Sequence, residues 1–278
     1  MAIKIVTDST ADIPQTLAEE LGIAVIPLYA KFGDKSYRDR VDISEEEFYK
    51  KLISDPVHPT TSQPSPQDFA DVYSELSQDA SGIISVHISG KLSGTCNSAL
   101  RAKEMVSAKC PIEVVDSEMV SMGLGLIAIE AANIANSGKD FQQVVKEVKQ
   151  FIPHTHVWAL FDTLKYLAKG GRIGKAKSLL GSVLNIKPIL TVKDGEMAPA
   201  TQARSREKGI GLLYNFASNC TDIKDLSVMY TTTPDEAKIL ANRLGAIFDR
   251  DRIQIARLGS ALGVHAGPGA LAVALIES

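Results

Sequence analysis

The chain is poor in cysteine, in aromatic residues and in long apolar runs. Its 278 residues include three cysteines, Cys96, Cys110 and Cys220, and 6% aromatic residues. Cysteines so few, odd in number and far apart argue against a disulfide framework and against a cysteine-based zinc site. No run approaches the ~18 apolar residues of a membrane span, and the first residues enter a strand-like pattern without a signal peptide. We therefore expect a cytoplasmic protein without stable membrane insertion, whose interior consists mainly of aliphatic side chains.

The chain also has no large excess of positive or negative charge. Lys and Arg number 30 against 33 Asp and Glu, which gives a net charge of -3. A nearly balanced, slightly acidic chain lacks the basic footprint of a nucleic-acid-binding protein. With 45% hydrophobic and 23% charged residues, the composition is that of an ordinary globular protein. The length favours two domains.

The first half alternates strand-like and helical patterns. Apolar runs typical of buried strands lie at 3–6, 23–28, 83–88 and 112–115, and helical patterns include 93–106 and 124–135. This alternation predicts βαβ units and therefore a Rossmann-like parallel sheet flanked by helices. Ser44 with Glu47 forms a capping box. Residues 55–66, rich in Pro, Thr and Ser, are predicted to form a loop, from which another helix starts at Ser65-Pro66.

The pattern changes after a helix predicted at 140–151. Asp194-Gly195 lies between two strand-like segments and predicts a hairpin. Thr233 with Glu236 predicts another capping box. Two closing strands are expected at 253–258 and 271–276, around a glycine-rich loop at 259–269. Hairpins mixed with helices predict an α+β second half with a mixed sheet, so that residues 1–152 and 153–278 form separate domains.

Motifs for metals and nucleotide cofactors do not fit. His154 and His156 alternate along a predicted strand and so face opposite sides of it, which makes them a poor pair of metal ligands. Residues 123–128 match a relaxed dinucleotide fingerprint but begin several residues after their strand. We therefore expect neither a metal nor another cofactor.

Three segments carry polar groups that could bind a ligand. The loop 59–66 clusters hydroxyls, including that of Thr61, on a backbone stiffened by prolines. Residues 89–95 follow a buried strand and enter a helix, where free N–H groups and the helix dipole favour an anion. Ser93 could equally be a simple helix cap. His265 lies in the glycine-rich loop, whose glycines suggest close approach to a ligand.

Six motifs along the chain are shared with a known family. They are Thr7-Asp8-Ser9-Thr10-Ala11-Asp12-Ile13, Thr61-Ser62-Gln63-Pro64-Ser65-Pro66, Ser89-Gly90-Lys91-Leu92-Ser93-Gly94-Thr95, Val115-Asp116-Ser117, Gly170-Gly171-Arg172-Ile173 and His265-Ala266-Gly267-Pro268-Gly269-Ala270. In this order they resemble the DegV family of bacterial fatty-acid-binding proteins. The resemblance implies two α/β domains with a long-chain fatty acid, such as palmitate, in an apolar tunnel between them. It also implies that the hydroxyls of Thr61 and Ser93 hold the carboxylate, with Gly94, Ser62 and His265 near the site.

The resemblance further implies a carrier rather than an enzyme, acting in lipid transport or fatty acid metabolism. Some members deliver the bound fatty acid to a separate kinase, which phosphorylates the carboxylate. In that interpretation this chain has no catalytic residues, and Arg172, Arg204 and Arg206 are candidates for contact with the kinase. A solvated surface charge is the simpler interpretation of each arginine. Asp8 and Asp116, at strand ends, are interpreted as hydrogen-bond acceptors that organise loops.

Two alternatives stay open. One is a serine hydrolase with Ser93 as nucleophile and His265 as base, which requires the two side chains within hydrogen-bond reach and a third group that orients the histidine. The other is a carrier of a different anion, such as a phosphorylated metabolite, which requires a wider and more polar pocket.

Overall fold

The parallel sheet of the first half is confirmed. The computed structural model describes residues 2–180 and 186–278. Strands pair in the order β2-β1-β6-β7, and all pairs are parallel. Their bounds are β1 Ala2–Asp8, β2 Ile23–Ile26, β6 Ala80–His87 and β7 Ile112–Asp116. Strand β6 is buried over most of its length, as expected for a parallel strand with helices on both faces of its sheet.

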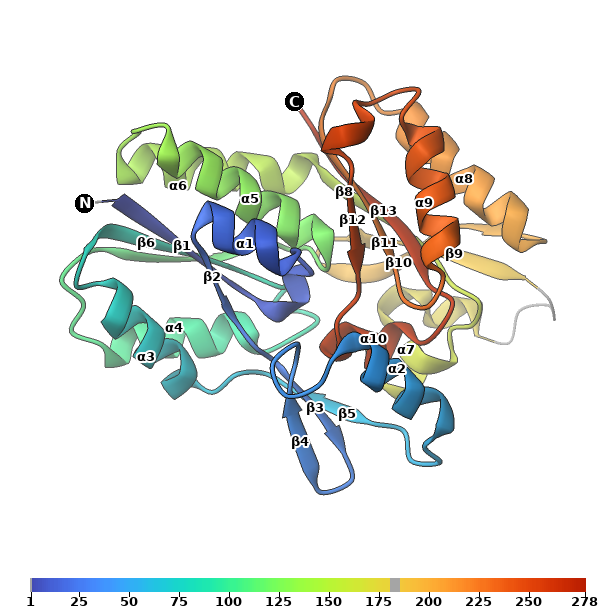
Figure 1. Cartoon of the computed structure of the whole chain (residues 1–278), viewed down its shortest axis with the longest axis horizontal. Helices are drawn as coiled ribbons and strands as arrows, with labels where there is room; N and C mark the ends of the chain where they lie inside the picture. The colour runs from blue at the N-terminus through green and yellow to red at the C-terminus, as the bar shows by residue number, and fades with distance from the viewer. Residues whose placement is uncertain (1, 181–185) are drawn as a thin grey trace.

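Helices flank this sheet on both faces. Helices α3 and α4 lie on one face, and α1, α5 and α6 lie on the other (Figure 1). Their bounds are α1 Gln15–Leu21, α3 Pro66–Leu76, α4 Thr95–Met105, α5 Met122–Asn136 and α6 Phe141–Phe151. Ser65 caps α3, with Pro66 at its first position, as the sequence predicted. Short 3-10 helices lie at η1 Ser9–Ala11, η2 Ile152–His154, η3 Gly174–Leu179 and η4 Arg250–Arg252.

The second half contains the predicted mixed sheet. Its strand order is β10-β9-β8-β13-β11-β12, in which only the β11–β12 pair is parallel. The bounds are β8 Thr155–Leu160, β9 Lys187–Lys193, β10 Glu196–Ala203, β11 Ile223–Tyr230, β12 Gln254–Arg257 and β13 Leu271–Glu277. Helices α8 Arg206–Ser218 and α9 Pro234–Leu244 pack on one face. The predicted hairpin is confirmed, because Asp194 and Gly195 both have positive φ and join β9 to β10 as a two-residue turn.

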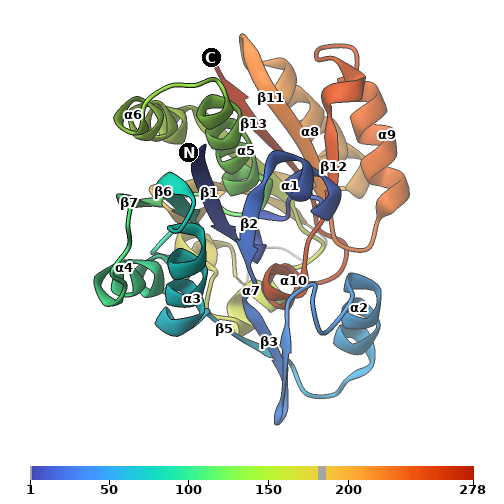
Figure 2. The same cartoon turned by 60° about the vertical axis from the view of Figure 1, so that its left-hand side comes forward.

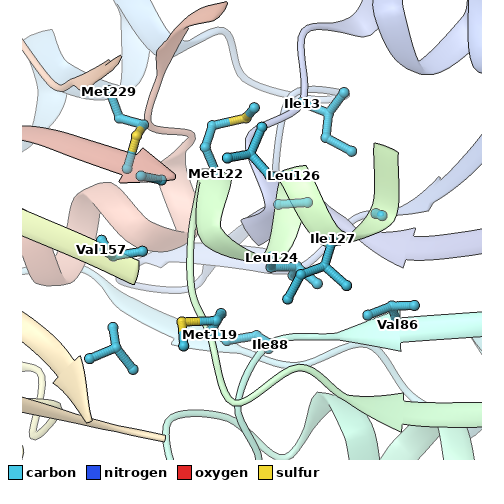
Figure 3. Packing of buried hydrophobic residues seen from close by; sticks show 14 of the residues in the cluster. Ile13, Val86, Ile88, Met119, Met122, Leu124, Leu126, Ile127, Val157 and Met229 are labelled. Atoms are coloured by element: carbon cyan, nitrogen blue, oxygen red, sulfur yellow. The ribbon is translucent and has the colours of Figure 1, made fainter. Parts of the chain in front are cut away.

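Helix α5 lies between the two large sheets. It is buried on nearly every side, and it contacts β1 of the parallel sheet as well as β13 and β11 of the mixed sheet. Figure 3 shows Leu124 and Ile127 of α5 close to Val86 of β6, with Val157 of β8 and Met229 of β11 nearby. One hydrophobic cluster therefore joins both halves of the chain. The two large sheets divide along the chain near residue 152, and the assignment of two domains stays a prediction.

A small third sheet was not predicted. Its strands, β3 Tyr29–Phe32, β4 Lys35–Arg38 and β5 Thr60–Ser62, pair in the order β4-β3-β5. Helix α2 Glu45–Ser54 begins at the predicted capping box of Ser44 and Glu47. The prediction of a loop throughout 55–66 was wrong at β5, because the three residues of this strand gain their hydrogen bonds from β3, about thirty residues earlier.

The prediction of a glycine-rich loop at 259–269 was also wrong. Residues Ser260–Ala266 form helix α10, which packs on α2, β3, β5 and the short helix α7 Lys165–Lys169 (Figure 2). The side chain of Asp39 accepts hydrogen bonds from the backbone N–H and the hydroxyl of Ser260, at 2.6 and 2.7 Å. This acceptor lies 221 positions away along the chain. The signal that starts α10 is therefore tertiary and cannot be read locally.

Two smaller predictions were wrong. Helix α9 begins at Pro234 as expected, but Thr233 makes no side-chain cap. The partners of the predicted box contact Arg206 instead: Glu236 accepts from its guanidinium at 2.6 Å, and Thr233 Oγ1 accepts at 3.4 Å. His154 ends η2 rather than sharing a strand with His156, whose Nε2 lies 3.1 Å from Glu277.

In the ranges 2–180 and 186–278, none of the helices combines the length and the apolar character needed to cross a membrane.

Candidate functional site

A cavity opens where the three sheets and α10 meet. It encloses about 1010 Å³ of space between atoms, which includes the open space at its mouth. Most of its wall is apolar. Its lining includes Leu28, Ile88, Leu92, Val120, Val157, Ala159, Phe161, Leu167, Met197, Met229, Leu258, Ala261, Leu262, Ala266, Ala270 and Ala272. Strands β8, β10, β11 and β13 of the mixed sheet contribute to this wall, and Ile88 directly follows β6 of the parallel sheet, so the cavity depends on both halves of the chain.

The structure brings five of the predicted site residues to this cavity. They are Thr61, Ser62, Ser93, Arg172 and His265. Thr61 comes from β5 of the small sheet, Ser93 from the loop after β6, and His265 from α10. Three segments far apart in the sequence thus place polar groups on a mostly apolar wall, whose further polar residues are Thr10, Gln63 and Ser121.

The hydroxyls of Thr61 and Ser93 each have a side-chain hydrogen-bond partner. Thr61 Oγ1 lies 3.0 Å from His265 Nε2, and Ser93 Oγ lies 2.8 Å from Thr95 Oγ1. The backbone N–H of Thr95 also donates to Ser93 Oγ, at 3.3 Å. Thr61 and Ser93 are neutral hydrogen-bonding groups, and the charged side chain in the lining is that of Arg172.

Ser93 is not the cap of α4. The capping position is Gly94, which has no side chain and makes no side-chain cap hydrogen bond. The interpretation of Ser93 as a simple N-cap was therefore wrong. The N–H of Thr95, the first residue of α4, donates to Ser93 Oγ, and Gly94 offers no side-chain acceptor, so the N–H groups that follow in the first turn are left for another acceptor.

The loops beside the cavity are organised by two carboxylate acceptors, the buried Asp8 and the exposed Asp116, as predicted. Asp8 accepts from the backbone N–H groups of Thr10 and Ile88, at 3.1 Å each. Asp116 accepts from the N–H groups of Gly90 and Glu118, at 3.0 and 2.9 Å. The interpretation of both aspartates as loop-organising residues is confirmed.

His265 is held as a neutral ring. Burial, followed by the positive charge of Arg172 and the proximity of His58, lowers its pKa to about 4. Its Nδ1 has no hydrogen-bond partner among the described residues and packs against Gly170, whose Cα could not carry a Cβ there. At neutral pH the ring is therefore uncharged and bonds only through Nε2.

The three arginines have different places. Arg172 lines the cavity, and its guanidinium donates to the backbone carbonyls of Leu92 and Gly170, at 3.2 and 2.8 Å. Arg206 lies elsewhere, paired with Glu236 and with Asp162. Arg204 is exposed and does not line the cavity. Of the arginines proposed as partner contacts, only Arg172 is at the cavity.

The geometry does not form a hydrolase triad around Ser93. His265 Nε2 bonds to Thr61 rather than to Ser93, and no described carboxylate orients its Nδ1. A serine–histidine–aspartate chain exists elsewhere, unforeseen from the sequence: Ser85 Oγ lies 2.6 Å from His87 Nε2, whose Nδ1 lies 2.9 Å from Asp8. All three side chains are buried and none lines the cavity. This chain stabilises the core and has no access to a substrate.

Gln63 is a cavity residue that the sequence analysis did not single out. It lies within the motif Thr61-Ser62-Gln63-Pro64-Ser65-Pro66, two residues after Thr61, and it lines the cavity with its amide against Gly94. Its position within that motif is the signal that could have identified it.

Comparison with known proteins places this fold and cavity in one family. A model of the family described as "Uncharacterised protein, DegV family" matches residues 2–278. The chain belongs to the DegV family. Among its relatives, a DegV domain-containing protein of Caldanaerobacter subterraneus is 36% identical over 275 residues, covering 98% of this chain and 97% of the relative. Protein DegV of Bacillus subtilis is 31% identical over 278 residues, covering 98% of each chain.

Solved structures of the DegV family share the fold. A DegV family protein of Thermus thermophilus, described by its fatty acid binding, has a TM-score of 0.92 and 35% identity, with complete coverage of both chains. DegV of Bacillus subtilis, described as a fatty acid binding protein, has a TM-score of 0.89 and 30% identity, again over both whole chains. A stearic-acid-binding protein of Eubacterium ventriosum has a TM-score of 0.90 and 27% identity, covering 99% of this chain and 98% of that one. The DegV fold expected from the six motifs is confirmed.

Proposed function

We propose that this DegV protein binds one long-chain fatty acid, such as palmitate, in the cavity, with the carboxylate at Thr61 and Ser93. The observation that carries the proposal is the distribution of polarity over the wall. Aliphatic side chains line most of the cavity, and the hydroxyls of Thr61 and Ser93 are among its few polar lining groups, with helix α4 starting directly after Ser93 and Gly94. The descriptions of the related structures as fatty acid binding proteins support the same ligand class.

The apolar wall supplies most of the affinity. Each buried methylene contributes about 0.8 kcal/mol, so roughly a dozen give about 10 kcal/mol before the cost of ordering the ligand. The hydroxyls orient the acid group. An ionised carboxylate only accepts hydrogen bonds, and neutral donors hold it without the desolvation penalty of a buried ion pair.

His265 determines what Thr61 can donate. The Thr61 hydroxyl has one proton, which it can give either to His265 Nε2 or to a carboxylate. Donation to the carboxylate requires the tautomer of His265 that carries its proton on Nε2 and donates to Thr61 Oγ1. A neutral His265 with an unprotonated Nδ1 against Gly170 fits this arrangement.

The protein acts as a cytoplasmic carrier without catalytic residues or a cofactor of its own, in lipid transport or fatty acid metabolism. A separate kinase that phosphorylates the carboxylate is its proposed partner, with Arg172 at the contact. The absence of a triad at Ser93 disfavours a hydrolase, and the apolar wall disfavours a phosphorylated metabolite as ligand.

The proposed function is tested by titrating delipidated protein with palmitate. We expect saturation at one site per chain. The double variant Thr61→Ala/Ser93→Ala should bind palmitate at least about tenfold more weakly, because hydrogen bonds to a charged group contribute about 1.5–3 kcal/mol each. Circular dichroism serves as the control for folding. A folded double variant with the affinity of the native protein would remove both residues from the site.

A further inference from the structure

The Gln63 amide lies against the glycine that follows Ser93. A Cβ built on Gly94 would come within 2.4 Å of Gln63 Oε1 and 2.5 Å of Gln63 Nε2. The amide therefore occupies the space that any side chain at position 94 would need. Since Gln63 is two residues from Thr61 and packs on the neighbour of Ser93, it lies between the two hydroxyl-bearing segments.

The amide has hydrogen-bonding capacity to spare. Gln63 Nε2 donates to Ser98 Oγ at 3.3 Å, and this is the hydrogen bond found for the amide among the described residues. A glutamine amide carries two N–H donors. Gln63 is exposed at the lip of the cavity, so its second N–H is accessible to a ligand there.

The hydrogen bond from Gln63 to Ser98 also links the small sheet to helix α4. Gln63 follows β5 of the small sheet, whereas Ser98 is in the first turn of α4, beside the parallel sheet. The side chain thus spans the boundary across which Thr61 and Ser93 face the same cavity, and it fixes the amide in place.

We propose that Gln63 is a third carboxylate donor, which binds the headgroup of the fatty acid through its second amide N–H. This inference rests on the proposed function. A carboxylate has about four acceptor sites, and Thr61 and Ser93 provide one hydroxyl proton each. Gln63 adds a donor without adding a charge, and Gly94 is required because a side chain there would displace the amide.

The substitution Gln63→Glu tests whether Gln63 binds the ligand carboxylate or only maintains the local structure. The introduced carboxylate has nearly the same shape and can accept from the Ser98 hydroxyl, so the link to α4 persists. It cannot donate, and it places a negative charge beside the ligand carboxylate. The matched control is Gln67→Glu, at an exposed glutamine that is the second residue of α3, donates to Asp71 at 2.7 Å and does not line the cavity.

Two probes of equal chain length complete the test, palmitate and 1-hexadecanol. At pH 8 we expect Gln63→Glu to weaken palmitate binding by tenfold or more and to change hexadecanol binding less than twofold. At lower pH, where the introduced carboxyl group is protonated, palmitate affinity should recover. Gln67→Glu should leave both affinities unchanged. Gly94→Ala should weaken palmitate binding as much as Gln63→Ala does, with no further loss in the double variant, because both remove the same amide from the site.

The outcomes separate the two proposals. A native protein that binds neither probe contradicts the proposed function. If the native protein binds palmitate and Gln63→Glu binds it like Gln67→Glu, the assignment of Gln63 is wrong. Equal loss of palmitate and hexadecanol in Gln63→Glu, with unfolding temperatures unchanged, shows that the residue only shapes the cavity and also overturns the assignment.

Discussion

At the scale of single residues, one buried carboxylate joins four segments around the cavity. Asp12 accepts from the Arg40 guanidinium at 2.9 Å, from the Ser121 hydroxyl at 2.7 Å and from the Gly259 N–H at 2.9 Å. These partners belong to the turn after β4, to the start of α5 and to the segment before α10. Removing one member of such a buried cluster leaves the others without a partner, which is costly.

Asp12 makes stability depend on pH in an unusual direction. Burial raises its pKa from 3.8 to about 6, although Arg40, Ser121 and Gly259 oppose the change. The folded state therefore binds more protons than the unfolded state between these values. The stability that this group contributes is present at low pH and is lost as the pH rises through 6.

The variant Asp12→Asn tests this effect, since asparagine tolerates the left-handed backbone of residue 12. Urea unfolding of the native protein and of Asp12→Asn is measured at pH 4.5 and 7.5. The unfolding free energy of the native protein minus that of the variant should be about 2 kcal/mol larger at pH 4.5 than at pH 7.5. Asp42→Asn, at an exposed carboxylate whose pKa is lowered to about 2 by Arg38, should show no such change. A difference that is equal at both pH values, or larger at pH 7.5, would contradict the assignment.

Residues of the site differed in how far the sequence could identify them. Thr61, Ser93 and His265 could be selected because each is in a recognisable loop motif next to a strand or among glycines. Arg40 and Ser121 could not, because their partner Asp12 is 28 and 109 positions away and no local pattern marks a buried ion pair.

At the scale of elements, the β9–β10 hairpin supports the loop that carries Ser93. Ser89 Oγ donates to the carbonyl of Gly195 at 2.7 Å, and Lys91 Nζ donates to the carbonyl of Asp194 at 2.8 Å. Gly195 has φ 74°, and a Cβ there would lie 2.5 Å from Ser89 Oγ. The turn of the second half thus packs directly on the loop of the first half that carries Ser93, a proposed ligand contact.

Substitutions of two glycines at hairpin turns distinguish the effect of backbone strain from the effect of the contact between Gly195 and Ser89. Gly195→Ala and Gly33→Ala should each lose about 1–2 kcal/mol of unfolding free energy, because both positions have positive φ. Only Gly195→Ala also displaces Ser89, since Gly33 has open space around it. We therefore expect palmitate affinity to fall in Gly195→Ala and to stay native in Gly33→Ala. Equal affinities in the two variants would refute a role of the hairpin in the site.

Elements with strong local signals were predicted well. The parallel strands are continuous apolar runs, the capped helices have Ser and Pro at their starts, and Asp194-Gly195 specifies its turn. Strands β3, β4 and β5 and helix α10 were missed, because they are short and depend on one another. Helix α10 also contains a glycine, and the hydrogen bonds at its start are accepted by Asp39, which directly follows β4.

At the scale of the whole molecule, none of the three sheets contains the site alone. Thr61 belongs to the small sheet, Ser93 follows a strand of the parallel sheet, and Met197 and Met229 belong to the mixed sheet. A ligand that contacts all of them stabilises the folded arrangement by mass action, by about 2.7 kcal/mol at one hundred times its dissociation constant. A tightly bound lipid should therefore remain with the protein during purification.

The most direct measurement is the quantity and identity of lipid released when the purified native protein is denatured and extracted, determined by mass spectrometry. The account predicts close to one long-chain fatty acid per chain, and clearly less from the folded Thr61→Ala/Ser93→Ala variant. A native protein that releases no fatty acid, and takes up none when palmitate is added, would contradict it.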